Sequence, residues 1–208
     1  MVANALFAQE KVVESSAKKA PAWLGLSEPE YIITSSESET LDGAKAQCLA
    51  NIRQIIVSSV AVNISSSENY QEDISMSGNS MDAQRRYQTN IESIAASLPF
   101  VSDILLDDAE IYWRKFYNKK DKSYRYEVHA KYPFSTFKRN ELISEFMTQD
   151  KEQYDKYLAL KDGYSSDFTE VEYIDRAISE LNALRKYFFD AKRQNEVDAL
   201  VSNYRRMY

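Results

Sequence analysis

Histidine and cysteine are the side chains most often used for acid-base and nucleophilic chemistry, and the chain has one of each, His129 and Cys48. A nucleophilic triad needs a base held against the residue that it activates. His129 falls on the polar side of an alternating segment, two residues before Lys131, which predicts a solvated strand histidine. Cys48 falls among apolar residues at helical spacing, so we expect a buried structural thiol. A single cysteine also cannot form an internal disulfide.

The sequence contains no motif for a metal or an organic cofactor. One histidine and one cysteine cannot build a typical zinc site, and no HExxH motif occurs. Four scattered glycines exclude a P-loop and a dinucleotide-binding fingerprint. We therefore expect no cofactor, no metal and no catalytic residue.

Four carboxylates precede the clearest strand pattern of the chain: Asp103, Asp107, Asp108 and Glu110. Such a group could bind a hard cation, or serve as acid and base in glycoside hydrolysis. The spacing matches no calcium loop, so a solvated loop is the favoured interpretation. The alternative is an envelope glycan-binding protein or hydrolase, in which these carboxylates would share one deep cleft with tyrosines.

Composition indicates a folded protein that does not bind nucleic acid. The 208 residues are 44% hydrophobic and 28% charged, enough for one domain or a domain with an appendage. A net charge of −6 disfavours a nucleic-acid reader, because phosphate contacts need a positive face. The longest apolar run, from Ile52 to Ile64, is interrupted by polar residues and predicts no transmembrane span. Fifteen tyrosines suit a binding surface as well as a core.

The first residues resemble the end of a secretory signal. An apolar run from Val2 to Ala8 precedes the polar Gln9, Glu10 and Lys11. A basic segment is missing and the run is short, so we expect the leader to begin upstream of Met1. The alternative is a frayed N-terminus of a cytoplasmic protein. Residues 1–22 are thus expected to be a signal-peptide remnant and a flexible lead-in.

Residues 23–134 carry the patterns of an α+β domain. The sequence predicts a strand at 31–34, a helix from Ser38 or Thr40 to about Val57, and a strand at 60–64. Residues 65–81 fit a strand continuation or a loop, and 81–98 fit a helix or an extended segment. Two alternating runs, DDAEIYWRKFYN and SYRYEVHAKY, joined by four residues, predict a β-hairpin.

One part of this pattern resembles a known family. The segment EYIITSSESETLDGAKAQCLANIRQIIVSSVAVNI is followed, after Leu98 and Pro99, by the aromatic-rich hairpin. This order resembles the lipoprotein-20 domain family and is similar to the N-terminal domain of flagellar assembly protein T, over about residues 29–133. The resemblance implies a small bacterial cell-envelope domain, lipid-anchored or periplasmic, that acts in assembly or at surfaces. The chain lacks the family's lipid-attachment cysteine, since Cys48 lies too far along, and its helical C-terminal third has no counterpart there.

Residues 135–208 predict a helical module. A first helix should end at the Lys161-Asp162-Gly163 stop signal, and a capping box at 169–172 should start a second. The polar stretch 192–196 should connect it to a last helix at 197–208, giving packed helical hairpins and no coiled coil.

The expected fold is therefore α+β, a small antiparallel sheet packed on a helix and followed by a helical C-terminal extension. The expected function is that of a non-enzymatic, exported protein of the periplasm or outer membrane, with an assembly, scaffold or surface-interaction role. We expect an envelope protein as partner, and peripheral membrane association stays open. The candidate interaction surface comprises seven aromatic residues: Tyr112, Trp113, Tyr124, Tyr126, Tyr187, Tyr204 and Tyr208.

Overall fold

The computed structural model describes residues 10–66, 80–164 and 170–207. The fold is α+β, as predicted, and the chain forms two compact units. The first unit comprises Met1–Ile56 and Pro99–Arg139, and the second comprises Val57–Leu98 and Asn140–Tyr208. Among the described residues, 57–66 and 80–98 group with the C-terminal helices, whereas the sequence placed them in the α+β domain.

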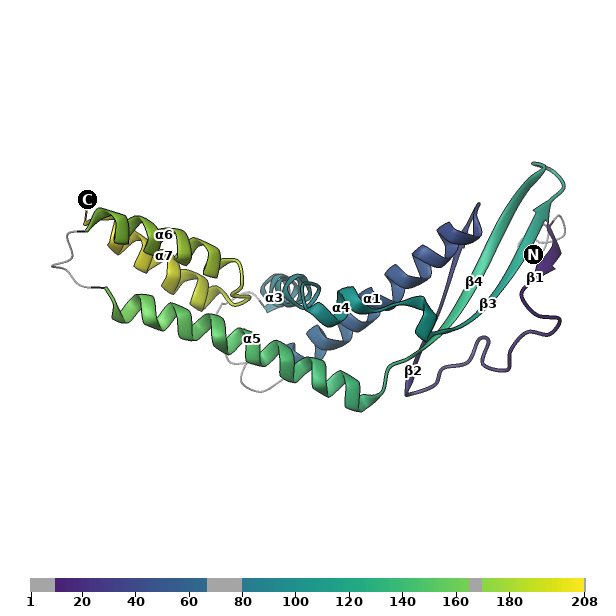
Figure 1. Cartoon of the computed structure of the whole chain (residues 1–208), viewed down its shortest axis with the longest axis horizontal. Coiled ribbons are helices and arrows are strands. Elements are labelled where there is room, and N and C mark those ends of the chain that lie inside the picture. The colour runs from purple at the N-terminus through teal and green to yellow at the C-terminus, as the bar shows by residue number, and fades with distance from the viewer. Residues whose placement is uncertain (1–9, 67–79, 165–169, 208) are drawn as a thin grey trace. The chain divides into compact units, whose positions relative to one another are not determined.

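The first unit is built on a four-stranded antiparallel sheet (Figure 1). Its strands lie in the order β1-β3-β4-β2. Their bounds are Glu10–Ser15 for β1, Tyr31–Ser38 for β2, Glu110–Asn118 for β3 and Ser123–Pro133 for β4. The predicted hairpin is confirmed as β3 and β4, and the predicted strand at 31–34 is confirmed and extends to Ser38.

β1 corrects the expectation of a flexible lead-in. Residues 10–15 pair with β3, with Glu10 opposite Asn118 and Ser15 opposite Arg114. The segment EKVVES has little apolar alternation, and Val12 and Val13 are 42% and 48% exposed. The strand forms because the outer edge of β3 offers backbone donors and acceptors, which a short segment of the same chain can satisfy.

Helix α1, Leu41–Ser65, follows β2 after a tight turn. The Thr40 hydroxyl accepts a hydrogen bond from the Gly43 amide at 3.1 Å, so Thr40 is the N-cap. The predicted end near Val57 and the predicted strand at 60–64 are both wrong. The run VAVNI continues the helix, because its buried residues, Val60, Ala61 and Ile64, share one helical face.

By length and composition α1 could also cross a membrane. An apolar stretch of 18 residues within α1 has a mean hydropathy of 1.3, and 39% of this stretch is buried inside the folded chain. Buried core helices of soluble proteins meet the same criteria. α1 also makes polar contacts with its own chain: Arg53 donates to the carbonyl oxygens of Ser102 and Ile104 at 3.0 and 2.9 Å. These contacts bind α1 to the end of the short helix α4, Pro99–Asp103, within the first unit.

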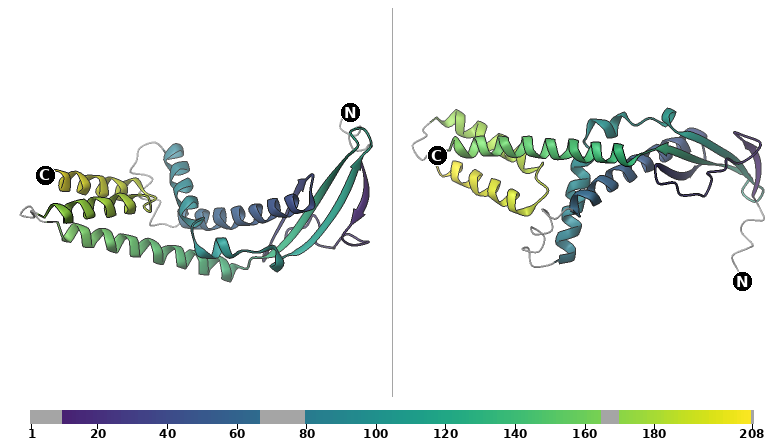
Figure 2. Two further views of the ribbon diagram at one scale, coloured as in Figure 1. Left: turned by 45° about the horizontal axis from the view of Figure 1, so that its top comes forward. Right: turned by 90° about the horizontal axis from the view of Figure 1, so that it is seen from below.

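The second unit is helical in the part of it that the structure describes. The segment 81–98 was left open between helix and extended segment, and most of it lies in helix α3, Ser80–Ala95. Three further helices are α5, Thr136–Asp162, whose main part lies in this unit, α6, Val171–Arg185, and α7, Ala191–Arg205. Figure 2 shows α6 and α7 side by side, and they share a core with α5. Its buried members are Tyr157, Ile174, Ala177, Leu181, Leu184, Phe188, Val197, Leu200, Val201 and Tyr204.

The helix ends differ from the predicted ones. Thr169 of the expected capping box lies outside the described residues, and the N-cap of α6 is Glu170, whose side chain makes no capping hydrogen bond. The expected connection at 192–196 is helical, and α7 starts earlier because Asp190 caps it by accepting from the Arg193 amide at 2.7 Å. The connection therefore lies at 186–190. Most of the open segment 65–81 falls on residues 67–79, outside the described ones.

Candidate functional site

Cys48 is buried against the sheet, as predicted. Its side chain is fully buried, and its thiol lies 3.4 Å from the Val128 carbonyl oxygen and 3.0 Å from the Ser36 hydroxyl. The Ser36 hydroxyl in turn donates to the Ala44 carbonyl oxygen at 2.5 Å, which joins β2 to the first turn of α1. Burial raises the pKa of the Cys48 thiol, so the unreactive protonated form is favoured.

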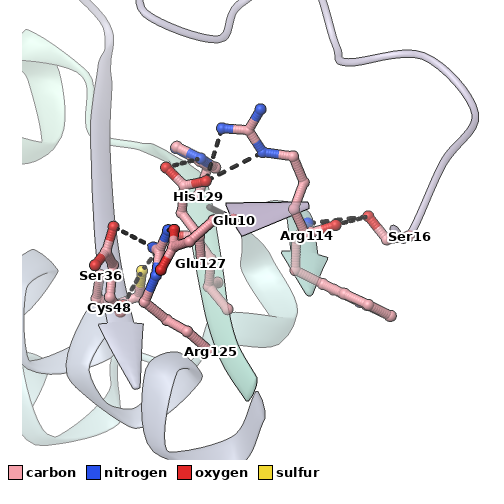
Figure 3. A network of polar contacts seen from close by, with 11 residues as sticks. Glu10, Ser16, Ser36, Cys48, Arg114, Arg125, Glu127 and His129 are labelled. Atoms are coloured by element: carbon pink, nitrogen blue, oxygen red, sulfur yellow. Dashed lines mark hydrogen bonds and ion pairs between the residues drawn. The ribbon is translucent and has the colours of Figure 1, made fainter. Parts of the chain in front are cut away.

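His129 and Cys48 do not form a catalytic pair, because β4 separates them. Val128 contributes to the α1 side of the sheet, and His129, the next residue of the strand, projects to the opposite face. Figure 3 shows Cys48 beside Ser36, apart from His129 and Arg114.

The expectation of a solvated His129 is wrong, since only 14% of its side chain is exposed. The ring stacks on Tyr112, with centroids 6.2 Å apart, and Nε2 lies 3.2 Å from the Glu127 carboxylate. Burial lowers the pKa of His129 and outweighs the opposing effect of Glu127. Neutral imidazole is therefore the favoured form in the folded protein.

A network of charged side chains crosses all four strands on this face of the sheet (Figure 3). Arg125 of β4 contacts Glu10 of β1 at 2.7 Å and Glu37 of β2 at 2.5 Å. Arg114 of β3 contacts Glu127 of β4 at 2.7 Å. Arg114 and Glu127 lie directly opposite one another in β3 and β4, whereas Arg125 reaches across β3 to Glu10 and diagonally to Glu37 on β2. The ion pairs therefore link all four strands on this face.

The four carboxylates noted in the sequence do not assemble into a metal centre. Asp103, Asp107 and Asp108 are exposed, and Glu110 accepts a hydrogen bond from the Trp23 indole at 2.9 Å. Over residues 10–66, 80–164 and 170–207, no three histidine, cysteine, aspartate or glutamate side chains are grouped to hold a metal ion. Glu110 thus has a structural role, because it binds the segment before β2 to the start of β3.

The candidate interaction surface is partly wrong. Tyr112 is only 6% exposed and Tyr204 is fully buried, so neither can be the surface of a partner site. Tyr208 lies outside the described residues. Tyr112 is buried on the His129 face, and Tyr204 closes the helical core with its hydroxyl 2.8 Å from the Leu160 carbonyl oxygen.

The remaining hairpin aromatics, on the α1 side of the sheet, do form a cluster. Lys115 lies opposite Tyr126, and Tyr117 lies opposite Tyr124. The Lys115 ammonium is 4.6 Å from the Tyr124 ring centre and 5.3 Å from that of Tyr126, and Tyr117 and Tyr124 are 5.1 Å apart. Trp113 adjoins the cluster, 6.2 Å from Tyr126. We call these five residues the hairpin patch.

The hairpin patch is accessible because its covering elements end before it. β2 pairs with β4 only from Tyr126 to Pro133, and α1 begins directly after β2, next to Ser36. The hairpin beyond Tyr126 is flanked by β1 alone (Figure 1). Tyr124 is consequently 50% exposed, while the other members are half-buried.

One further feature of this region was missed in the sequence. Residues 111–126 contain six of the 26 lysines and arginines and one of the 32 acidic residues, in a chain of net charge −6. Three of these lysines, Lys119, Lys120 and Lys122, lie exposed in the turn and are called the tip lysines. A charge count in short windows would have found them, whereas the net charge of the whole chain hides them.

Tyr187, 44% exposed, lies in the second unit beside a shallow groove of about 340 Å³. The groove is lined by Ser93, Ile94 and Ser97 after or within α3, and by Ala183, Lys186 and Tyr187 at the end of α6. It brings two serines, a lysine and a tyrosine together, a set that can hydrogen-bond a polar partner without offering a nucleophile held against a base.

Comparisons with protein-family models, with curated protein sequences and with solved structures found no match to this chain.

Proposed function

We propose that the chain is a non-enzymatic protein of the bacterial cell envelope, in the periplasm or at the outer membrane, with an assembly, scaffold or surface-interaction role. The observation that carries this proposal is the hairpin patch: aromatic and cationic side chains gathered on a part of the sheet that α1 and β2 leave uncovered. Tyrosine and tryptophan offer large, rigid contact area with a polar group at one end, which suits recognition.

The proposed location is supported by the apolar start of the chain and by the resemblance of residues 29–133 to the lipoprotein-20 domain family. The resemblance rests on the order strand, helix and aromatic hairpin, which β2, α1 and the hairpin of β3 and β4 follow. Helix α1 is longer than the resemblance implies, because residues 60–64, which were expected to form a strand after it, are part of the helix.

Cell fractionation tests the proposal. The gene is expressed from its natural start, and the product is followed in cytosol, periplasm and membranes together with its N-terminal sequence. We expect an exported product whose mature N-terminus lies near Gln9. A cytosolic product that retains residues 1–8 would contradict the proposed location.

A protein partner is the second part of the proposal and needs a separate measurement. A photo-crosslinking amino acid is placed at Tyr124 in the hairpin patch, at Tyr187 beside the groove, and at the exposed Val171 as a control. We expect a discrete adduct with an envelope protein from Tyr187 and none from Val171, and the Tyr124 position tests whether the hairpin patch contacts the same protein. Adducts that do not depend on position would contradict a specific interaction surface.

A further inference from the structure

The hairpin ends in a cationic tip. The tip lysines are exposed in the turn, and the Lys122 backbone, at φ 52°, reverses the chain there. Lys11 of β1 is also exposed and lies opposite Tyr117, so the neighbouring strand adds to the same charge. The acidic residues that face this region are Glu14, 3.9 Å from Lys115, Asp121, which accepts from Asn118 at 3.1 Å, and Glu10 and Glu37. Glu10 and Glu37 both pair with Arg125, and neither forms an ion pair with the tip lysines.

The aromatic members of the patch lie directly behind these charges. Tyr117 and Tyr124 flank the turn, Tyr126 follows one step further from it opposite Lys115, and Trp113 two steps further opposite Val128. The hairpin therefore presents lysines at its end, tyrosines immediately behind them and a tryptophan next along the same face. At a lipid bilayer, amphipathic rings favour the headgroup region, and lysines are attracted to anionic headgroups.

We propose that the hairpin tip docks the protein on an anionic lipid bilayer, with the tip lysines at lipid phosphates and the hairpin patch at headgroup depth. This inference rests on the proposed envelope function and names the partner of the hairpin patch as lipid. The rings do not form a flat stacking platform for a polysaccharide, because Tyr117 and Tyr124 are inclined at 42° and Trp113 and Tyr126 at 56°. Charge complementarity favours an anionic partner, since the tip is basic in a chain of net charge −6.

The test uses the purified full chain and two kinds of vesicle. One kind is an equimolar mixture of phosphatidylglycerol and phosphatidylcholine, and the other is phosphatidylcholine alone. We expect cosedimentation with the anionic vesicles, weakened by added salt because exposed charges are screened. A Trp23→Phe variant makes Trp113 the single tryptophan, and the tryptophan emission should move to shorter wavelength on anionic vesicles.

Two charge-reversal variants of equal net charge locate the contact. Lys119→Glu with Lys120→Glu changes the tip, and Lys156→Glu with Lys192→Glu changes exposed lysines of α5 and α7. The tip variant should lose about tenfold or more in vesicle affinity, since each basic residue near an anionic surface contributes severalfold. The control variant should stay within about twofold, since its lysines lie outside the hairpin. Melting temperatures of both variants are measured to confirm that they fold.

Four outcomes would overturn the inference: equal binding to neutral and anionic vesicles, equal loss in both variants, no response of Trp113, or binding to a soluble acidic polysaccharide or nucleic acid in place of vesicles. If the protein is exported in cells and ignores anionic vesicles, lipid docking is wrong and the envelope function stands. If it binds vesicles through the tip while the cellular product is cytosolic, the envelope function is wrong and the lipid contact stands.

Discussion

The Arg193 guanidinium lies 2.9 Å from the Asp150 carboxylate and joins the start of α7 to the middle of α5. Arg193 also bonds Asp190, the N-cap of its own helix, and lies 4.8 Å from the ring centres of Phe188 and Phe189. Asp150 and Asp190 are only 11% and 4% exposed. One cation therefore neutralises two buried carboxylates at the point where the connection between α6 and α7 meets α5.

Replacing Arg193 with alanine should destabilise the second unit strongly, by about 3–5 kcal/mol, because it leaves both carboxylates buried without a countercharge. Denaturant unfolding of the full chain measures the loss. The matched control is Arg185→Ala, which removes an ion pair to Asp198 between side chains that are 45% and 48% exposed. That variant should lose less than about 1 kcal/mol. Equal losses in the two variants would show that the Arg193 network is not a structural centre.

Arg125 should control the attachment of β1. Because Arg125 pairs with Glu10 and also with Glu37, Arg125→Ala removes a link from β1 across the sheet to β2. The amides of residues 10–15 should then exchange with deuterium roughly fivefold faster, as expected for the loss of a half-exposed ion pair at an edge strand. Lys11→Ala, an exposed change in the same strand, serves as the control. Unchanged exchange in Arg125→Ala would mean that backbone pairing alone holds β1.

Cys48 should be structural and slow to react. Cys48→Ala removes a fully buried sulfur and should cost about 1–2 kcal/mol of unfolding free energy. The native thiol should react with a maleimide far more slowly than the denatured one, because burial both shields it and raises its pKa. Rapid labelling of the native protein would contradict this placement.

The stability of the first unit should fall as the pH drops below about 6.5, the ordinary pKa of histidine. The pKa of folded His129 is lowered, mainly by burial, so between the folded and unfolded pKa values the unfolded chain binds the extra proton. Stability therefore rises with pH through that window and is fully present above it. His129→Gln removes the titration, and the difference in unfolding free energy between the two proteins should change with pH there. A difference independent of pH from 5 to 7.5, about the range in which histidine titrates, would refute this.

Tyr204 should act as a core residue and not as a contact for partners. Tyr204→Ala should cost about 3–5 kcal/mol, because it empties a fully buried aromatic site. Tyr204→Phe keeps the ring and removes the hydroxyl, which bonds the Leu160 carbonyl oxygen and Tyr173, so about 1–2 kcal/mol is expected. Thermal unfolding compares both with the parent chain. If Tyr204→Ala had the same melting temperature as the parent chain, the described packing would be wrong.

Local periodicity predicted the elements whose own residues decide their structure. The alternation from Ser123 to Tyr132 has a period of two, and the stripe from Ile174 to Leu184 has a helical period, so β4 and α6 follow from the sequence. The placement of Cys48 follows in the same way, since it lies on the apolar face that Ala44 and Ile52 continue. The tyrosine-rich hairpin was likewise predicted as a candidate surface, although its concentration of positive charge was not.

Tertiary contacts decided the rest. The run from Val60 to Ile64 fits both periods, and it is helical because the helical register buries Val60, Ala61 and Ile64 together. The strand β1 has hardly any signal of its own and depends on the free edge of β3. Tyrosine type and spacing alone could not separate the buried Tyr204 from the exposed Tyr124. Burial of a tyrosine depends on which elements pack over it, and that packing is a property of the folded chain and not of the local sequence.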